Sequence, residues 1–412
     1  MISHRKGLRL WWVLFGLLLL IGMVSFFYGI AGPDPQRTWQ VYLINFLFWS
    51  GIAFSATVFV AILNITNARW GRPLKRLAEA LGAFTPVAFL LFWGLYFGSE
   101  SIFPWVRDPV QGRESWLNTV SLFTRNGIGL FLLTGVSVAL IYCSVRGDLK
   151  QVSRQTGSGR EGPPEEPSND PFWRAQVILS PISSILFCFV FSLVAFDLVM
   201  SLDPHWTSTL FGGYYFIGSF YSGLAALTLL SGLSYRPGGI STELKKVLQP
   251  RHLHDLGKLL FGFCLMAGYL FYTQFLVIWY GNIPEETRYL IQRLYQTPWK
   301  TVSFMILLMA FGVPFVFLLI RRIKMKPEAM IPLSVLILAG MWLERFILVV
   351  PSLSKGQGVP LGLTEVLITG GFLGAMGLTA GLFLNRFPLL PLSDPLFQEE
   401  WKRIQGEINP VS

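Results

Sequence analysis

The chain has 412 residues, of which 52% are hydrophobic and only 14% are charged, and its formal net charge is +10. A soluble domain carries about 25% charged residues, so this composition excludes an ordinary soluble protein. Apolar runs of roughly 20 residues, the length that a helix needs to cross a bilayer, recur along the whole sequence. The fold class is therefore predicted to be all-α and polytopic in the membrane.

Ten transmembrane helices are predicted in chain order, at about 8–30, 39–65, 78–98, 116–145, 173–201, 209–234, 255–281, 300–321, 328–351 and 363–385. The last contains GGFLGAMGLTAGLF, which fits a membrane helix because glycine is frequent in such helices. The first is too long in its apolar part for the core of a cleaved signal peptide. Gly, Pro, Ser and acidic residues dominate 155–171, which is predicted to be a disordered cytoplasmic linker.

A weak internal repeat relates spans 2–5 to spans 6–9. The third span ends in FWGLYFGSES and the seventh in VIWYGNIPEE, and each combines aromatic residues, a glycine and then carboxylates. Duplicated bundles are common in transport folds. The predicted units are an N-terminal flanking helix, a first bundle, a second bundle, and a C-terminal helix with its tail: 1–38, 39–201, 209–351 and 363–412.

Basic residues set the orientation. If the N-terminus lies inside, the inner segments carry roughly three times as many Lys and Arg residues as the outer ones, a bias that fixes topology. Both termini are therefore predicted to be cytoplasmic. The net charge follows from this bias and from attraction to anionic lipid headgroups, so it requires no nucleic-acid partner.

Three charged side chains fall inside predicted spans: Asp197, Glu344 and Arg345. Such residues are costly in lipid, so they usually face a bundle interior and mark an ion or proton route. Structural pairing with neighbouring helices is the alternative for Glu344 and Arg345. Adjacent residues point in different directions on a helix, so these two are not expected to pair with each other. For Asp197, the alternative is a position near the membrane interface.

The stretch LDPHW at 202–206 offers Asp203 and His205 as an outer proton mouth. Histidine titrates in the physiological range. The stretch also has a plain explanation, because Asp-Pro favours a turn and Trp206 suits the aromatic belt at a membrane interface.

The seventh span is the richest in polar groups. Tyr269, Tyr272 and Thr273 fall on one helical face, where their hydroxyls would either order water into a relay or bond to neighbouring helices. Three ionisable residues at its inner start and two carboxylates past its outer end are further candidates: His254, Asp255, Lys258, Glu285 and Glu286. The segment 282–299 is predicted to contain an amphipathic helix at the interface.

The sequence contains no P-loop, HExxH, dinucleotide-binding or CxxCH haem motif. Its four histidines fall at predicted helix ends, so no pair inside the membrane is placed to hold a haem. The chain is therefore predicted to bind no metal or redox cofactor of its own.

Four stretches are similar to a known family: SLDPHWTSTLFGGYYFIGSFYSG (201–223), RHLHDLGKLLFGF (251–263), FLVIWYGNIPEET (275–287) and NARWGRPLKRLAE (67–79). They resemble the NrfD/polysulfide-reductase membrane anchors and, among these, the F-type membrane subunit of alternative complex III. The resemblance covers roughly 38–385. HDLGKLLF and IWYGNIPEET are its most specific parts.

This resemblance implies two four-helix bundles, made of spans 2–5 and 6–9, in a bacterial inner membrane. It implies a quinol:electron-acceptor oxidoreductase of respiration or photosynthesis, in which iron–sulfur and haem c subunits carry the electrons. A related membrane subunit is associated with the quinol site, and the F-type subunit is proposed to help conduct protons. No quinone-site motif is matched residue by residue.

The resulting hypothesis is a cofactor-free subunit with a proton half-channel. It runs from Asp203 and His205 to Asp197, with Glu344 and the hydroxyls of the seventh span deeper in the membrane. Three alternatives remain open: a quinol-binding anchor, a stand-alone secondary transporter and a purely structural anchor.

Overall fold

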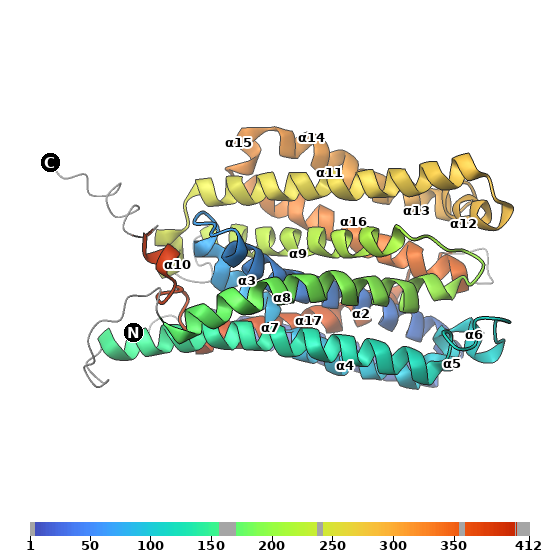
Figure 1. Cartoon of the computed structure of the whole chain (residues 1–412), viewed down its shortest axis with the longest axis horizontal. Helices are drawn as coiled ribbons and strands as arrows, with labels where there is room; N and C mark the ends of the chain where they lie inside the picture. Colours follow the sequence, from blue (N-terminus) through green and yellow to red (C-terminus); the bar gives the residue numbers. More distant parts are fainter. Residues whose placement is uncertain (1–4, 156–169, 237–241, 354–358, 400, 402–412) are drawn as a thin grey trace.

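The computed structural model describes residues 5–155, 170–236, 242–353, 359–399 and 401. Within these residues, ten helices are long and apolar enough to cross a membrane. Each runs in the direction opposite to the one before it (Figure 1). The prediction of an all-α fold with ten spans is confirmed. Most of the predicted linker, 156–169, lies outside the described residues.

The spans are built from α1 (Arg5–Ala31), α2 (Pro35–Ile65), α3 (Lys75–Gly82) with α4 (Thr85–Phe97), α7 (Thr119–Gln155), α8 (Pro171–Val194), α9 (Phe211–Tyr235), α11 (Pro250–Gly281), α13 (Trp299–Ile306) with α14 (Val313–Leu319), α16 (Pro327–Leu353) and α17 (Leu363–Arg386). Short helices lie at the two ends of the molecule: α5 (Ser99–Ile102), α6 (Pro104–Arg107), α10 (Thr242–Val247), α12 (Pro284–Leu294) and α15 (Arg321–Lys324). We call these ends the α10 end and the α12 end (Figure 1).

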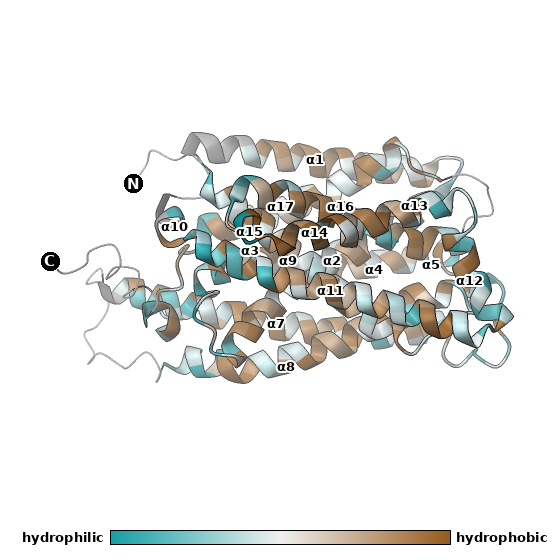
Figure 2. Cartoon of the chain, turned by 90° about the horizontal axis from the view of Figure 1, so that it is seen from above, coloured by the Kyte–Doolittle hydropathy of each residue, from teal (hydrophilic) through white to brown (hydrophobic). Residues whose placement is uncertain are grey.

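The helix α2 lies at the centre, where it packs against α8, α9, α16 and α17. Nearly all of its residues are buried, including a series of polar ones: Asn45, Ser50, Ser55, Thr57 and Asn64. Several of these side chains donate a hydrogen bond to a carbonyl of the preceding turn, as Asn45 does to Val41 at 2.9 Å. Such local bonds allow polar groups to sit in an apolar interior. Hydrophobic residues dominate the middle of the bundle and hydrophilic ones gather at its ends (Figure 2).

Glycine explains how α17 closes on α1. A Cβ atom added to Gly22 of α1 would lie 2.3 Å from the Cα of Gly371 in α17. No larger residue fits at this crossing, because the two backbones are in direct contact. The glycine-rich tenth span is therefore a packing surface for the first one.

Three spans depart from a regular α-helix. The fifth ends in a π-helical turn, Ala195–Val199, which carries Asp197, and a 3-10 turn, Met200–Leu202. The eighth contains a second π-helical turn, Leu307–Gly312, between α13 and α14. The third is broken between α3 and α4. The amphipathic helix expected within 282–299 is present as α12.

Candidate functional site

Asp197 is fully buried and held by three side chains of the neighbouring loop and helix. Arg125 of α7 donates from Nε to Oδ2 at 2.6 Å and from Nη2 to Oδ1 at 2.7 Å. Asn126 donates to Oδ2 at 2.5 Å, and the indole of Trp116 donates to Oδ1 at 3.1 Å. The guanidinium also lies 4.0 Å from the centre of the Trp116 ring. Both oxygens are thus occupied by a bidentate pair of the strongest kind.

Glu344 and Arg345 pair with each other, so the expectation that they would not is wrong. Arg345 Nη1 lies 2.7 Å from Glu344 Oε2, and both side chains are buried. The side chain of Arg345 is long enough to fold back along α16. Its Nη2 atom donates to the hydroxyl of Ser219 in α9 at 3.1 Å. Glu344 Oε1 makes no hydrogen bond of standard geometry within the described part of the chain, although the Tyr214 hydroxyl lies beside the carboxylate.

A cavity of about 860 Å³ lies against Glu344, between α9, α11, α12, α13 and α16. Most of its wall is apolar. Besides Glu344 Oε1, the wall includes two side chains with a buried nitrogen that has no hydrogen-bond partner among the described residues: Trp206 Nε1 and Gln274 Nε2. Ligand sites in proteins are typically apolar cavities of about 300–1,000 Å³ with a few convergent polar groups.

The α12 end of this cavity is covered by α12. The ring of Tyr289 stacks on that of Trp206, with 3.9 Å between centroids. Arg293 is buried under Tyr289 and donates to Ile347 O at 3.1 Å and to Ser352 Oγ at 2.6 Å. Burial lowers the pKa of the Arg293 guanidinium and raises the pKa of the Tyr289 hydroxyl. Asp203 is close enough to act on both groups by its charge.

The other candidates near this end differ in exposure. Tyr269 and Tyr272 line the cavity but are 65% and 58% exposed, on the uncovered face of α11. Thr273 donates to the Tyr269 carbonyl at 2.8 Å within its own helix. His205 is exposed and Asp203 is half-buried. Glu285 and Glu286 lie in the first turn of α12, where acidic side chains complement the helix dipole. All four residues lie at the surface of the α12 end.

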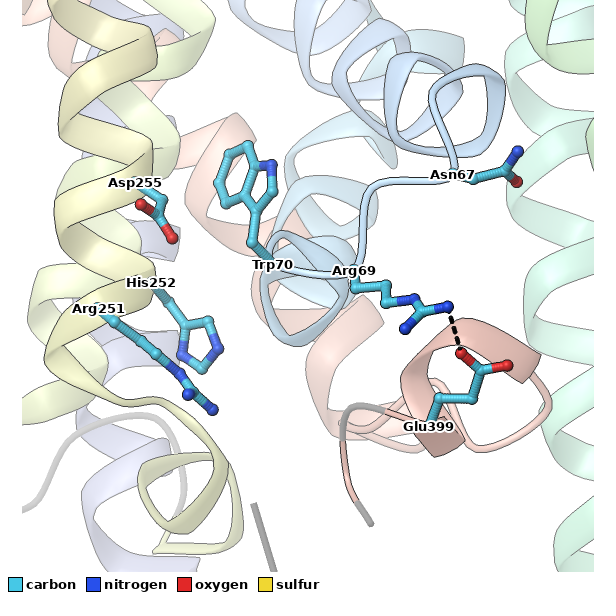
Figure 3. Close-up of a pocket in the computed structure, with 7 residues that line it drawn as sticks. All are labelled: Asn67, Arg69, Trp70, Arg251, His252, Asp255 and Glu399. Atoms are coloured by element: carbon cyan, nitrogen blue, oxygen red, sulfur yellow. Dashed lines mark ion pairs between the residues drawn. The ribbon is translucent and has the colours of Figure 1, made fainter. Parts of the chain in front are cut away.

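A second pocket, of about 430 Å³, lies at the α10 end (Figure 3). It is lined by the start of α11, the loop after α2 and the segment after α17: Asn67, Arg69, Trp70, Arg251, His252, Asp255 and Glu399. Arg69 and Glu399 form an ion pair of 2.9 Å at its edge. Of the inner candidates, Asp255 lies 2.7 Å from Lys258 and 3.6 Å from His254, so these three form a cluster on α11.

Sequence reasoning missed a cluster of buried charges at the α10 end. Arg72, Lys75 and Arg76 lie between the second and third predicted spans, and each is at most 1% exposed. Their anions come from three places: Glu79 on the same helix, Asp148 on α7 and Asp394 after α17. Burial by itself would raise the pKa of Asp394, but the charges of Lys75 and Arg72 outweigh it and hold the pKa below its ordinary value.

No group of three or more His, Cys, Asp or Glu side chains that could hold a metal occurs among the residues the structure describes. The ten spans and the buried charges define a multi-pass integral membrane protein. A model of the family described as polysulphide reductase, NrfD, matches residues 29–355, about four fifths of the chain. The chain belongs to the NrfD family. No curated protein sequence matches it.

Family membership indicates a membrane subunit of a quinone-interacting redox complex. Such subunits work with iron–sulfur and other redox subunits in the membrane.

Proposed function

We propose that the chain is the F-type membrane subunit of a quinol:electron-acceptor oxidoreductase of the alternative complex III kind. The four stretches quoted above support this assignment within the NrfD family. In this proposal the α10 end is cytoplasmic, the membrane is a bacterial inner membrane, and iron–sulfur, cytochrome c and related NrfD-like subunits are the partners. The chain itself contributes a path for protons rather than a step of electron transfer.

One observation carries the proton path: Glu344 is a buried carboxylate on the wall of a cavity, and its Oε1 makes no hydrogen bond of standard geometry among the described residues. A carboxylate that carries protons needs an oxygen that can be reached by water or by another donor. Arg345 holds the other oxygen and so fixes the carboxylate in place. Asp197 lacks this property, because its oxygens already accept four hydrogen bonds.

The proposed route starts at the α12 end, at Asp203, passes Tyr289 and enters the cavity toward Glu344. His205 lies at the mouth, and Tyr269, Tyr272 and Thr273 flank the cavity on α11. Asp197 forms a separate branch that positions α7 against the fifth span. Redox chemistry in the neighbouring subunits would drive the protonation of Glu344.

The test is Glu344→Gln in the assembled complex, with proton release and electron transfer measured together in vesicles. We expect fewer protons per electron while the complex remains assembled. Glu328→Gln is the matched control, because Glu328 lies on the same helix, at its exposed start. An unchanged stoichiometry in Glu344→Gln would refute the path.

The partners are tested separately, by purifying the native complex through a tag on this chain and identifying its subunits by mass spectrometry. Iron–sulfur and cytochrome c subunits are expected. A chain that is recovered alone and that transports a solute in vesicles would instead support a secondary transporter.

A quinol site is the second candidate function, and the same cavity favours it. A quinol hydroxyl would donate to Glu344 Oε1, while the indole of Trp206 and the amide of Gln274 would donate to its oxygens. This cavity lies among spans 6–9. Photolabelling with an azido-quinone should mark peptides of α9 and α11, and an excess of quinone should prevent it. Labelling confined to α2–α8 would exclude this cavity.

A further inference from the structure

The segment that follows α17, residues 388–399, packs on the α10 end of the helices around α2. Asp394 is its anchor. The Oδ2 atom accepts from Arg72 Nη1 and from Lys75 Nζ, each at 2.8 Å. All three side chains are at most 1% exposed. One carboxylate of this segment therefore pairs with two buried cations, and Glu79 adds a second negative charge close to them.

Further contacts hold the same segment without adding charge. Ser393 donates from its backbone nitrogen and its hydroxyl to Asp148 Oδ1, at 2.8 and 2.6 Å. Phe397 is 1% exposed and packs with Val247 of α10. The Arg69–Glu399 pair at the edge is solvent-exposed and adds little (Figure 3).

Beneath Asp394 lies a column of buried polar side chains between α2, α3 and α8. Lys75 Nζ donates to Gln176 Oε1 at 2.8 Å, and Arg72 Nη1 donates to Asn64 Oδ1 at 2.6 Å. Asn64 in turn donates to Ser180 Oγ at 3.0 Å. Two features lie against Arg72 and Lys75 at this end: the carboxylate of Asp394 and the ring of Trp173 in α8, whose centre is 5.4 and 5.6 Å from the two cations.

Arg72 and Lys75 thus form a carboxylate site whose occupant is the chain's own Asp394. Two buried cations are tolerated only while an anion is present, since an uncompensated ion in a low dielectric is costly. If Asp394 leaves, water or another anion must take its place. The other contacts of this short segment are Ser393 to Asp148, Gln398 to Gln151, the exposed Arg69–Glu399 pair, and the packing of Leu390, Leu392 and Phe397.

We propose that residues 388–399 form a plug that closes the polar column at the α10 end, and that Asp394 is the ligand that seats it. Release of the plug admits water and small anions to Arg72 and Lys75. The proposal does not depend on the proton path through Glu344, because it concerns the opposite end of the molecule.

The test uses a cysteine in the column. Ser180→Cys is introduced into a chain in which Cys143, Cys188 and Cys264 are replaced by serine or alanine, and its reaction with a water-soluble sulfonated methanethiosulfonate is timed. With the plug in place, the reaction should be slow. Asp394→Asn, and a chain ending at Phe387, should each accelerate it at least tenfold. Glu399→Gln is the matched control and should leave the rate unchanged.

The charge of the reagent provides a second readout. In the chain without the plug, the negative sulfonate should react faster than its positive trimethylammonium analogue, because Arg72 and Lys75 have then lost the carboxylate that pairs with both. A peptide spanning 388–401 should slow the reaction again, and the same peptide with Asn at 394 should not. Val349→Cys, at a fully buried position of α16, should react slowly in every variant and so reports intact folding. Equal Ser180→Cys rates with and without the plug, or a fast rate in the plugged chain, would overturn the proposal.

Discussion

Asp197 and Glu344 are both buried carboxylates, but their environments differ, and we infer different roles for them. Four hydrogen bonds, two of them from the Arg125 guanidinium, surround Asp197. Glu344 lines a cavity, with one oxygen held by Arg345 and one that makes no hydrogen bond of standard geometry among the described residues. The hydrogen bonds of Asp197 fix α7 against the fifth span, whereas Glu344 keeps one oxygen available as an acceptor. The depth of the two residues in the membrane would not by itself distinguish their roles.

Asp197→Asn is therefore expected to cost stability. The amide keeps the shape but leaves the Arg125 guanidinium without its counter-ion, a loss of roughly 3 kcal/mol for a buried pair. Thermal unfolding of the purified complex measures this loss of stability. Asp203→Asn, at a half-buried position, should change stability by less than about 1 kcal/mol. If the two variants unfold at the same temperature, Asp197 does not clamp α7 as described.

At the level of elements, a buried arginine ties α12 to α16. Arg293 reaches from α12 to carbonyl and hydroxyl groups at the end of α16, and its guanidinium lies 3.5 Å from the centre of the Tyr289 ring. A lysine has a point charge and no planar fork, so it cannot reproduce these contacts. Arg293 thus adds the charged contact to a cover that the Tyr289–Trp206 stack and a hydrogen bond from Gln292 to Pro351 O also hold.

Arg293→Lys is expected to loosen α12. Amide hydrogen exchange in Pro284–Leu294 should accelerate at least tenfold, while exchange in the core of α16 stays as it was. Arg288→Lys is the comparison, since Arg288 is an exposed residue of the same helix. Equal exchange in both variants would show that Arg293 does not hold α12 in place.

The elements themselves could be predicted from the sequence, because a span is a local property. Length and apolar content located all ten, and the acidic start of α12 also marks its first turn. Pairings between distant residues could not be predicted. Arg72 and Lys75 look like ordinary loop cations until Asp394 is brought beside them. The Glu344 cavity, likewise, exists only where five helices meet.

At the level of the whole molecule, the plug should be insensitive to pH over the physiological range. The pKa of Asp394 lies below its ordinary value of 3.8, so its contribution is complete above that value and is lost as the pH falls below it. Hydrogen exchange in 393–399, corrected for the intrinsic rate, should be constant from about pH 5 to 8. Release between pH 5 and 8 would show that another group controls the segment.

The pairing of Asp394 with Arg72 also sets an order on biosynthesis. The two residues are 322 positions apart in the chain. Chains grow from the N-terminus at about 5–20 residues per second, so Arg72 and Lys75 emerge roughly 15–65 s before their anion. During that interval the start of the third span keeps its cations in water or among lipid phosphates. A segment translated late thus completes the pairing of charges at the start of the third span.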